Sequence, residues 1–172
     1  MTMSQTKSTA AETPVTPRRR ITMERVYNAP IEEVWELWTT KEGIESWWGP
    51  DGFKTTVRAI DLRVGGELRY AFTAVAKEQI AFMEKAGMPT TTESRVRYTE
   101  VSPPNRLRYT HLADFIPGVA PYNVDTVVEL TQTAQGVRMT LTFDAMHDEH
   151  WTEMAVKGWT MELEKLAKLL AA

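Results

Sequence analysis

Two adjacent tryptophans followed by Gly-Pro, at residues 47–50, constrain the fold of this chain more than any other feature. Each indole needs apolar cover, and the Gly-Pro pair ends a helix and turns the chain. The chain of 172 residues holds six tryptophans, and four of them lie between Trp35 and Trp48. This concentration predicts a large core or an aromatic-lined cavity, with the paired rings held at a fixed corner of the fold.

The composition fits one domain with a single core, because 42% of the residues are hydrophobic and 25% are charged. The net charge of -3 does not indicate a nucleic-acid partner. No stretch approaches the roughly 20 apolar residues that a membrane span needs. The absence of cysteine excludes disulfides and thiolate-bound metals, and it is compatible with the cytoplasm, where we expect the protein to reside.

The N-terminal segment predicts a domain boundary. Residues 1–17 are rich in Ser, Thr, Ala and Pro and lack the apolar run of a secretory signal. The three arginines at 18–20 read as a solvated start to the first strand rather than as an anion contact. We therefore expect a disordered tail over residues 1–20 and one domain over residues 21–172.

Hydrophobic periodicity predicts the elements of this domain. A strand is followed by two short helices, the first starting at Pro30 and the second capped by Thr40. Further strands precede a long amphipathic helix whose apolar stripe includes Val156, Trp159 and Leu163. The strands are expected at 21–27, 54–60, 67–72, 93–101, 106–111, 123–133 and 137–143, and the long helix at 148–170. The fold class is α+β, with an antiparallel sheet that closes over the long helix.

Residues 77–92 interrupt the run of strands. They contain a helix-competent stretch that ends at Gly87-Met88-Pro89. This segment could be a lid over a cavity, a contact in a homodimer, or a plain connection between strands, and the sequence leaves the three open.

Four motifs together resemble a known family. They are Ser46-Trp47-Trp48-Gly49-Pro50, Val64-Gly65-Gly66-Glu67-Leu68-Arg69, Pro103-Pro104-Asn105-Arg106-Leu107, and Gly158-Trp159. The chain resembles the bacterial AHSA-like branch, related to the C-terminal domain of the activator of the ninety-kilodalton heat-shock-protein ATPase, within the START-like (SRPBCC) superfamily. The resemblance implies a helix-grip fold, with a curved sheet of about six to seven strands around the C-terminal helix. In relatives, the cavity between them accommodates lipids, steroids or polyketides.

Strand and helix patterns nominate residues for such a cavity. Alternation places aromatic side chains on the inner face of the sheet, while tryptophans and Phe115 close its ends. Gly158 would let a ligand approach the helix closely. The candidate ligand-binding residues are Trp35, Trp38, Trp48, Tyr70, Phe72, Tyr98, Tyr109, Phe115, Phe143, Gly158, Trp159 and Leu163.

Signals for catalysis are weak. The chain has no nucleophile elbow, phosphate loop or dinucleotide fingerprint. The weak catalytic candidates are Arg69, Tyr109 and His111, which could polarise a carbonyl or move a proton in a pocket. Residues 144–150 group two histidines with three carboxylates, but Asp148 reads better as a helix cap than as a metal ligand. We expect no metal and no cofactor.

The sequence supports three functions from different classes. The first is a binding module for a small apolar or aromatic molecule. The second, by analogy with the family, is a co-chaperone-like interaction module. The third is a cyclase- or lyase-type enzyme acting on an apolar substrate, which we favour least.

Overall fold

Segments with period-two alternation form one antiparallel sheet in the computed structural model, which describes residues 18–171. The tail predicted over residues 1–17 lies outside the described residues. Each helix and strand falls within a few residues of its predicted position. The elements are β1 (Arg20–Tyr27), α1 (Ile31–Thr39), α2 (Lys41–Trp47), β2 (Phe53–Ile60), β3 (Glu67–Ala74), α3 (Lys77–Lys85), β4 (Thr91–Ser102), β5 (Arg106–Ala113), β6 (Tyr122–Thr133), β7 (Gly136–Asp144) and α4 (Glu149–Ala171).

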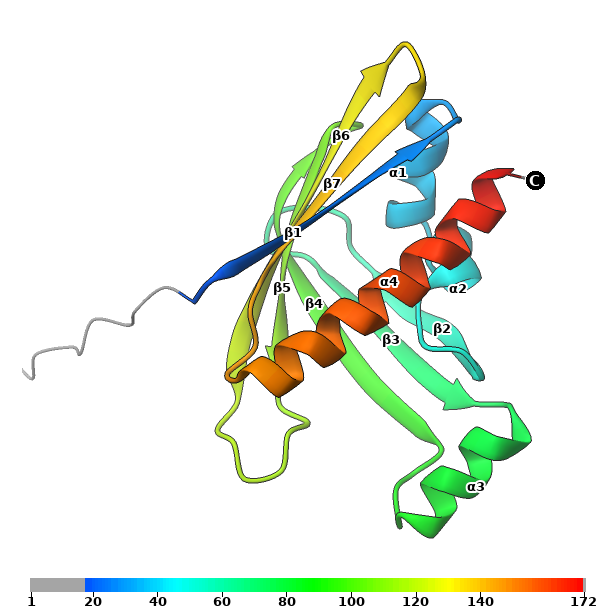
Figure 1. Ribbon diagram of the computed structural model, residues 1–172, viewed down its shortest axis with the longest axis vertical. Helices are drawn as coiled ribbons and strands as arrows, with labels where there is room; N and C mark the ends of the chain where they lie inside the picture. The colour runs from blue at the N-terminus through cyan, green and yellow to red at the C-terminus, as the bar shows by residue number, and fades with distance from the viewer. Residues whose placement is uncertain (1–17, 172) are drawn as a thin grey trace, which may run out of the picture.

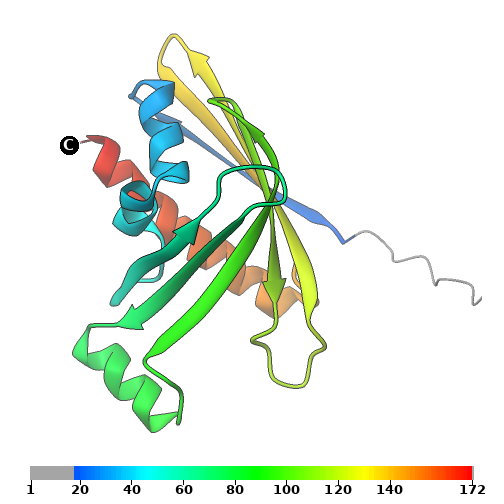
Figure 2. The same ribbon diagram turned by 180° about the vertical axis from the view of Figure 1, so that it is seen from behind.

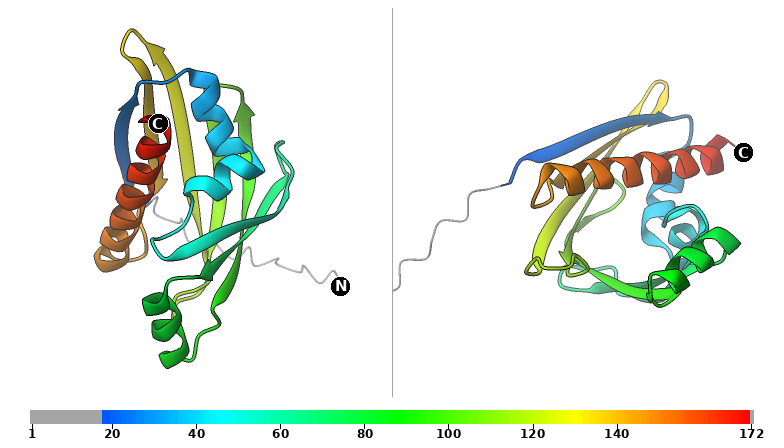
Figure 3. Two further views of the ribbon diagram at one scale, coloured as in Figure 1. Left: turned by 90° about the vertical axis from the view of Figure 1, so that its right-hand side faces the viewer. Right: turned by 60° about the horizontal axis from the view of Figure 1, so that its bottom comes forward.

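The sheet has the order β1-β7-β6-β5-β4-β3-β2. Strands β2 to β7 follow one another as antiparallel neighbours, and β1 joins the outer edge of β7. Figures 1 and 2 show the sheet curving strongly, with α4 running along its concave side. The end view in Figure 3 shows α1 and α2 on that same side. The structure confirms the α+β helix-grip fold.

The two short helices meet at Thr40. This residue ends α1, where its backbone N–H donates to the Glu36 carbonyl, and its side chain caps α2 by accepting from Gly43 N at 3.0 Å. A single residue thus ends one helix and starts the next, as a good N-cap allows. The sharp junction brings the aromatic stripe of α1 against the end of α2.

Tryptophans from α1 and α2 form part of the central core. The rings of Trp38 and Trp47 make an edge contact, with centroids 4.7 Å apart. Trp47 Nε1 donates to the Leu37 carbonyl at 2.7 Å, and Trp38 Nε1 donates to Met139 Sδ at 3.3 Å. Both rings are buried, and they share one core cluster with Leu163 of α4. These rings therefore pack α1 and α2 against the core between the sheet and α4.

Helix α3 covers the end of the β3–β4 hairpin (Figure 1). Just before it, the backbone N–H groups of Val75 and Ala76 both donate to the Gly52 carbonyl. Met83 is the buried residue of the helix, whereas Phe82 is exposed. The helix thus connects two strands and braces the turn that precedes β2. None of the helices in the described part of the chain is long and apolar enough to cross a membrane.

The arginines at 18–20 do more than start the first strand. Arg20 belongs to β1, one residue earlier than predicted. Arg19 pairs with Glu149 at 3.0 Å, and the guanidinium of Arg18 lies 4.5 Å from the ring centre of Tyr122. Arg19 and Arg20 are exposed, as expected of a solvated start to the strand, and contacts of Arg18 and Arg19 also tie the start of β1 to β6 and α4.

Two glycines in helices give a first, paired prediction. A Cβ added at Gly158 in α4 meets no atom of the described residues within 4 Å, whereas one at Gly43 in α2 would lie 2.4 Å from the Glu36 carbonyl oxygen. We expect Gly158→Ala to raise the free energy of unfolding by about 0.5–1 kcal/mol, because alanine loses less backbone entropy in a helix. Gly43→Ala should lower it by about 1–3 kcal/mol through overpacking. Urea denaturation checks both values, and a loss of stability in Gly158→Ala would contradict the open space around Gly158.

Candidate functional site

A cavity of about 210 Å³ lies between α4 and the inner face of the sheet. Its walls come from strands β3 to β7, the loop after β5, the loop between β7 and α4, the segment after α2, and α4. The strands contribute residues of inward parity, as strand alternation dictates. The lining residues are Trp48, Tyr70, Phe72, Val96, Tyr109, His111, Phe115, Val124, Thr126, Phe143, Met146, Ala155, Trp159 and Glu162.

Aromatic rings form most of the wall. Trp48 contacts Tyr70 edge-on, with centroids 5.3 Å apart, and lies 6.2 Å from the ring of Tyr109. On the opposite side, Phe143 and Trp159 lie 6.3 Å apart. Edge and tilted contacts of this kind are favourable arrangements of aromatic pairs, so the rings of the wall support one another.

A single carboxylate, from Glu162, belongs to the described lining. Its Oε1 accepts a hydrogen bond from Gly49 N at 3.0 Å, and the neighbouring Lys165 Nζ donates to the Gly49 carbonyl at 2.9 Å. Gly49 has a φ of +102°, and a Cβ there would lie 2.8 Å from Thr55 Oγ1. Only glycine adopts this conformation without strain. The conformation of Gly49 directs its N–H toward Glu162.

Burial raises the pKa of the Glu162 carboxyl from 4.5 to about 7, and the Gly49 N–H and Lys165 only partly oppose this. Burial likewise raises the pKa of Tyr70 to about 12, and that of Tyr109 well above its ordinary value. Both phenols are therefore neutral at physiological pH. The Glu162 carboxyl, in contrast, gains or loses its proton at a pH close to 7.

His111 completes the titratable lining. One of its ring nitrogens, Nε2, lies 3.1 Å from Ser94 Oγ, and burial lowers the pKa of the imidazole, with Asp114 opposing the shift. The neutral ring is thus the favoured form inside the protein.

Trp48 has an unsatisfied polar atom. The residue is only 8% exposed, and its Nε1 has no hydrogen-bond partner among residues 18–171. Leaving a buried donor unpaired costs roughly 1–3 kcal/mol. Its neighbour Trp47 has its own N–H satisfied by the Leu37 carbonyl, so the two adjacent indoles have different roles.

The structure brings most of the predicted aromatic residues to this cavity. Those that line it are Trp48, Tyr70, Phe72, Tyr109, Phe115, Phe143 and Trp159. Trp38, Tyr98 and Leu163 are instead buried in the core, and Trp35 packs against it, partly buried. Gly158 does not line the cavity. A Cβ added at this position would meet open space among the described residues, so this glycine does not let a ligand in the cavity approach the helix.

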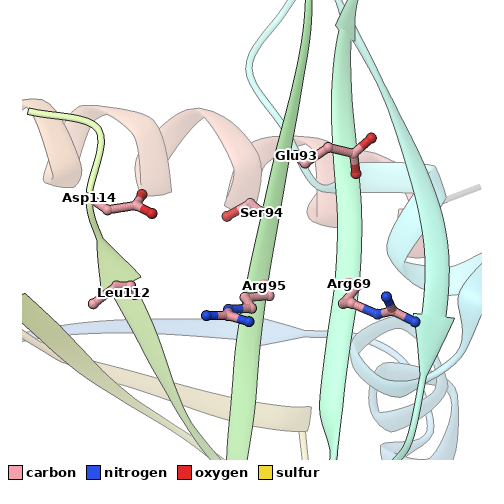
Figure 4. Close-up of a pocket in the computed structure, with 6 residues that line it drawn as sticks. All are labelled: Arg69, Glu93, Ser94, Arg95, Leu112 and Asp114. Atoms are coloured by element: carbon pink, nitrogen blue, oxygen red, sulfur yellow. The ribbon is translucent and has the colours of Figure 1, made fainter. Parts of the chain in front are cut away.

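Arg69 lies on the outer face of the sheet, so it does not join the other two catalytic candidates. Leu68 and Tyr70 on either side are buried, and alternation turns the exposed Arg69 the other way. It lines an outer hollow of about 380 Å³. Figure 4 shows its side chain extending away from Arg95. Tyr109 and His111 do line the cavity, but the predicted catalytic trio is not assembled.

The group of acids and histidines at residues 144–150 has a structural role. Asp148 Oδ1 accepts from Trp151 N at 2.8 Å and so caps α4. His147 Nδ1 lies 3.0 Å from the Tyr122 hydroxyl. Within residues 18–171, no three metal-ligating side chains gather in one place. The described lining of the cavity also includes no residue of the 77–92 segment.

Glu162 was missed at the sequence level. Its signal is an acidic residue three positions after Trp159, which places a carboxylate on the buried stripe of α4. Thr126, Met146 and Ala155 were missed as well. Small or flexible side chains carry no sequence signature of a cavity, because they serve equally well in a packed core.

Comparisons with known proteins agree with this geometry. A family model described as "Activator of Hsp90 ATPase homolog 1-like protein" matches residues 28–171. A crystal structure of a Chromobacterium violaceum protein is similar, with a TM-score of 0.72 and 27% identity, over 89% of this chain and 97% of that one. An AHSA1-like protein from Aeromonas hydrophila is similar in fold, with a TM-score of 0.65 and 21% identity, over 88% of this chain and 94% of that one. No curated protein matches this sequence.

The raised pKa of Glu162 predicts a pH-dependent stability. The unfolded carboxyl ionises near 4.5 and the folded one near 7, so the unfolded state loses its proton first as the pH rises. The contribution of Glu162 to the free energy of unfolding should therefore fall by roughly 1–3 kcal/mol between about pH 5 and pH 8. Urea denaturation of the wild type and of Glu162→Gln over this range measures it as the difference between the two proteins.

The neighbouring titratable groups do not obscure this result. Tyr70, Tyr109 and Lys165 face Glu162, and the phenols stay neutral over the range. The lowered pKa of His111 adds stability as the pH rises, but it does so in both proteins and cancels in the difference. Glu164→Gln, at an exposed position of α4, is the matched control. Identical pH profiles for the wild type and Glu162→Gln would contradict the prediction.

Proposed function

The chain belongs to the family of activator of Hsp90 ATPase homolog 1-like proteins, and we propose that it binds a small apolar or aromatic molecule in the cavity between the sheet and α4. One observation carries the proposal. A cavity of about 210 Å³ persists beside a core whose tryptophans are fully buried, and aromatic rings line it.

The cost of such a cavity supports a ligand. Protein interiors are close-packed, and an unfilled cavity destabilises a fold in proportion to its volume. Ordered water would find polar partners near Glu162, but it is a poor filling along the aromatic part of the wall, because a buried water needs two to four polar partners. A small aromatic ligand would regain the missing contacts and cover the rings of Trp48, Phe143 and Trp159.

The position of Phe115 supports an entrance through which a ligand would reach the cavity. This residue lines the cavity and is nevertheless 52% exposed, so it stands at the mouth. It lies in the loop between β5 and β6, and its ring is 6.0 Å from Trp151 at the start of α4. A ligand would pass between this loop and the first turn of the helix.

The family description also names an activator of a chaperone ATPase, and that role is the alternative to binding. An enzymatic reaction has less support, because Arg69 lies on the opposite face of the sheet from Tyr109 and His111. We place the proposed ligand binding in the cytoplasm, with which the absence of cysteine is compatible.

Filling the cavity from α4 tests the proposal. Ala155 lines the cavity on the helix, so Ala155→Leu should occupy part of its volume without removing a polar group. We expect a discrete small-molecule adduct in native mass spectra of the wild type, released by mild organic extraction. The adduct should be lost, or at least about tenfold weaker, in Ala155→Leu, because the added methylenes overlap the ligand.

Gly158→Leu is the matched control, since it adds the same side chain to the same helix where a Cβ meets open space. This variant should keep the adduct. An unliganded mass for the wild type, together with no response to a panel of apolar compounds, would contradict the proposal. Stimulation of a chaperone ATPase by the unliganded protein would then favour the interaction role.

A further inference from the structure

We infer that the ligand of this cavity is an organic amine, bound as a cation by the Glu162 carboxylate and by the aromatic rings around it. The inference deepens the proposed function and rests on it. It names the chemical class that the polar atoms of the cavity would select.

The first argument is the charge balance of the lining. Glu162 takes part in none of the ion pairs of residues 18–171, and the charge of Lys165 only partly offsets the cost of burying its carboxylate. The nearest ammonium, that of Lys165, donates to the Gly49 carbonyl instead. No arginine or lysine belongs to the described lining. A carboxylate in an apolar cavity is stabilised by a cation and repels an anion, so the missing charge is positive.

The second argument is the surface around the carboxylate. Tyr70 and Tyr109 line the same cavity as Glu162, and the charge of Glu162 contributes to the raised pKa of both phenols. The ring of Trp48 lies 5.3 Å from that of Tyr70 and 6.2 Å from that of Tyr109. Aromatic faces attract cations, and the attraction is strongest where water is excluded. A carboxylate beside three such rings is suited to an ammonium group attached to an apolar body.

The third argument is the orientation of the carboxylate. Gly49 N–H occupies Oε1, and the described hydrogen bonds leave Oε2 without a donor. A protonated amine would supply that donor in a charge-assisted bond, which is stronger than a neutral one. The unpaired Nε1–H of the buried Trp48 adds a second polar contact, because it would donate to an oxygen on the same ligand.

Matched probes test the inference. Phenethylamine and tyramine are the amines, and propylbenzene and 4-propylphenol are their neutral counterparts, with a methyl group in place of the ammonium. We expect each amine to bind the wild type at least about tenfold more tightly than its neutral counterpart in fluorescence titrations of the tryptophans or in calorimetry. Tyramine should exceed phenethylamine, because its hydroxyl oxygen can accept from Trp48.

Glu162→Gln should remove the preference for amines and leave the neutral probes within about twofold of the wild type, because the glutamine amide keeps an oxygen for Gly49 N–H but carries no charge. Glu164→Gln, exposed on the same helix, should bind every probe as the wild type does. Circular dichroism and thermal melts establish that each variant is folded before binding is compared.

The outcomes separate the two proposals. Neutral probes that bind as tightly as the amines would overturn the amine inference and leave ligand binding intact. A folded Glu162→Gln that binds the amines as tightly as the wild type does would also overturn the amine inference alone. Binding of none of the four probes or of the wider apolar panel, in a protein that is free of adduct, would overturn the proposed function and the amine inference with it.

Discussion

The structure depends on the bonds that join Gly49 to α4. Gly49 N donates to Glu162 and Lys165 donates to the Gly49 carbonyl, so one peptide unit on each side of Gly49 is held by the same helix. The positive φ of Gly49 makes both contacts possible, and no larger residue adopts it without strain. This junction fastens the corner after α2 to the helix that the sheet encloses. It fixes Trp48 at the cavity wall and Glu162 inside the cavity at once, so the fold and the candidate site share one constraint.

Electrostatics then distinguishes this cavity from an ordinary gap in a core. Burial keeps Tyr70, Tyr109 and His111 neutral near pH 7, and it also raises the pKa of Glu162 into that range. Holding a carboxyl there costs stability whenever the group is ionised. A leucine at this position would pack against the same rings at no such cost. Glu162 is therefore a departure from the best packing, and departures of this kind gather where a protein binds or reacts.

The sequence predicted the fold well because each element has its own local signal. Alternation marked the strands, Thr40 marked the second helix, and the Gly-Pro stop marked the corner. The candidate site was predicted less completely, because alternation assigns a side chain to a face of the sheet without showing whether that face is packed or hollow. Tyr98 and Tyr109 have the same inward parity and both belong to the core cluster, yet only Tyr109 also lines the cavity. Glu162 escaped notice because a charge within an apolar stripe is read as a solvated position unless its partner, Gly49, is known to lie beside it.

The paired tryptophans show how one motif serves both core and site. Trp47 and Trp48 are adjacent in the sequence and both buried, but the end of α2 turns them toward different surroundings. Trp47 donates to a carbonyl of α1 and packs edge-on against Trp38, so it is fully satisfied within the fold. Trp48 packs against both of those rings and also lines the cavity, with its N–H unpaired among residues 18–171. A phenylalanine at residue 48 would avoid the cost of an unpaired donor, but it would also lose part of the larger ring that contacts Tyr70 and Tyr109. The indole at residue 48 therefore contributes packing to the cavity wall, and its N–H would gain a partner from an acceptor on the proposed ligand.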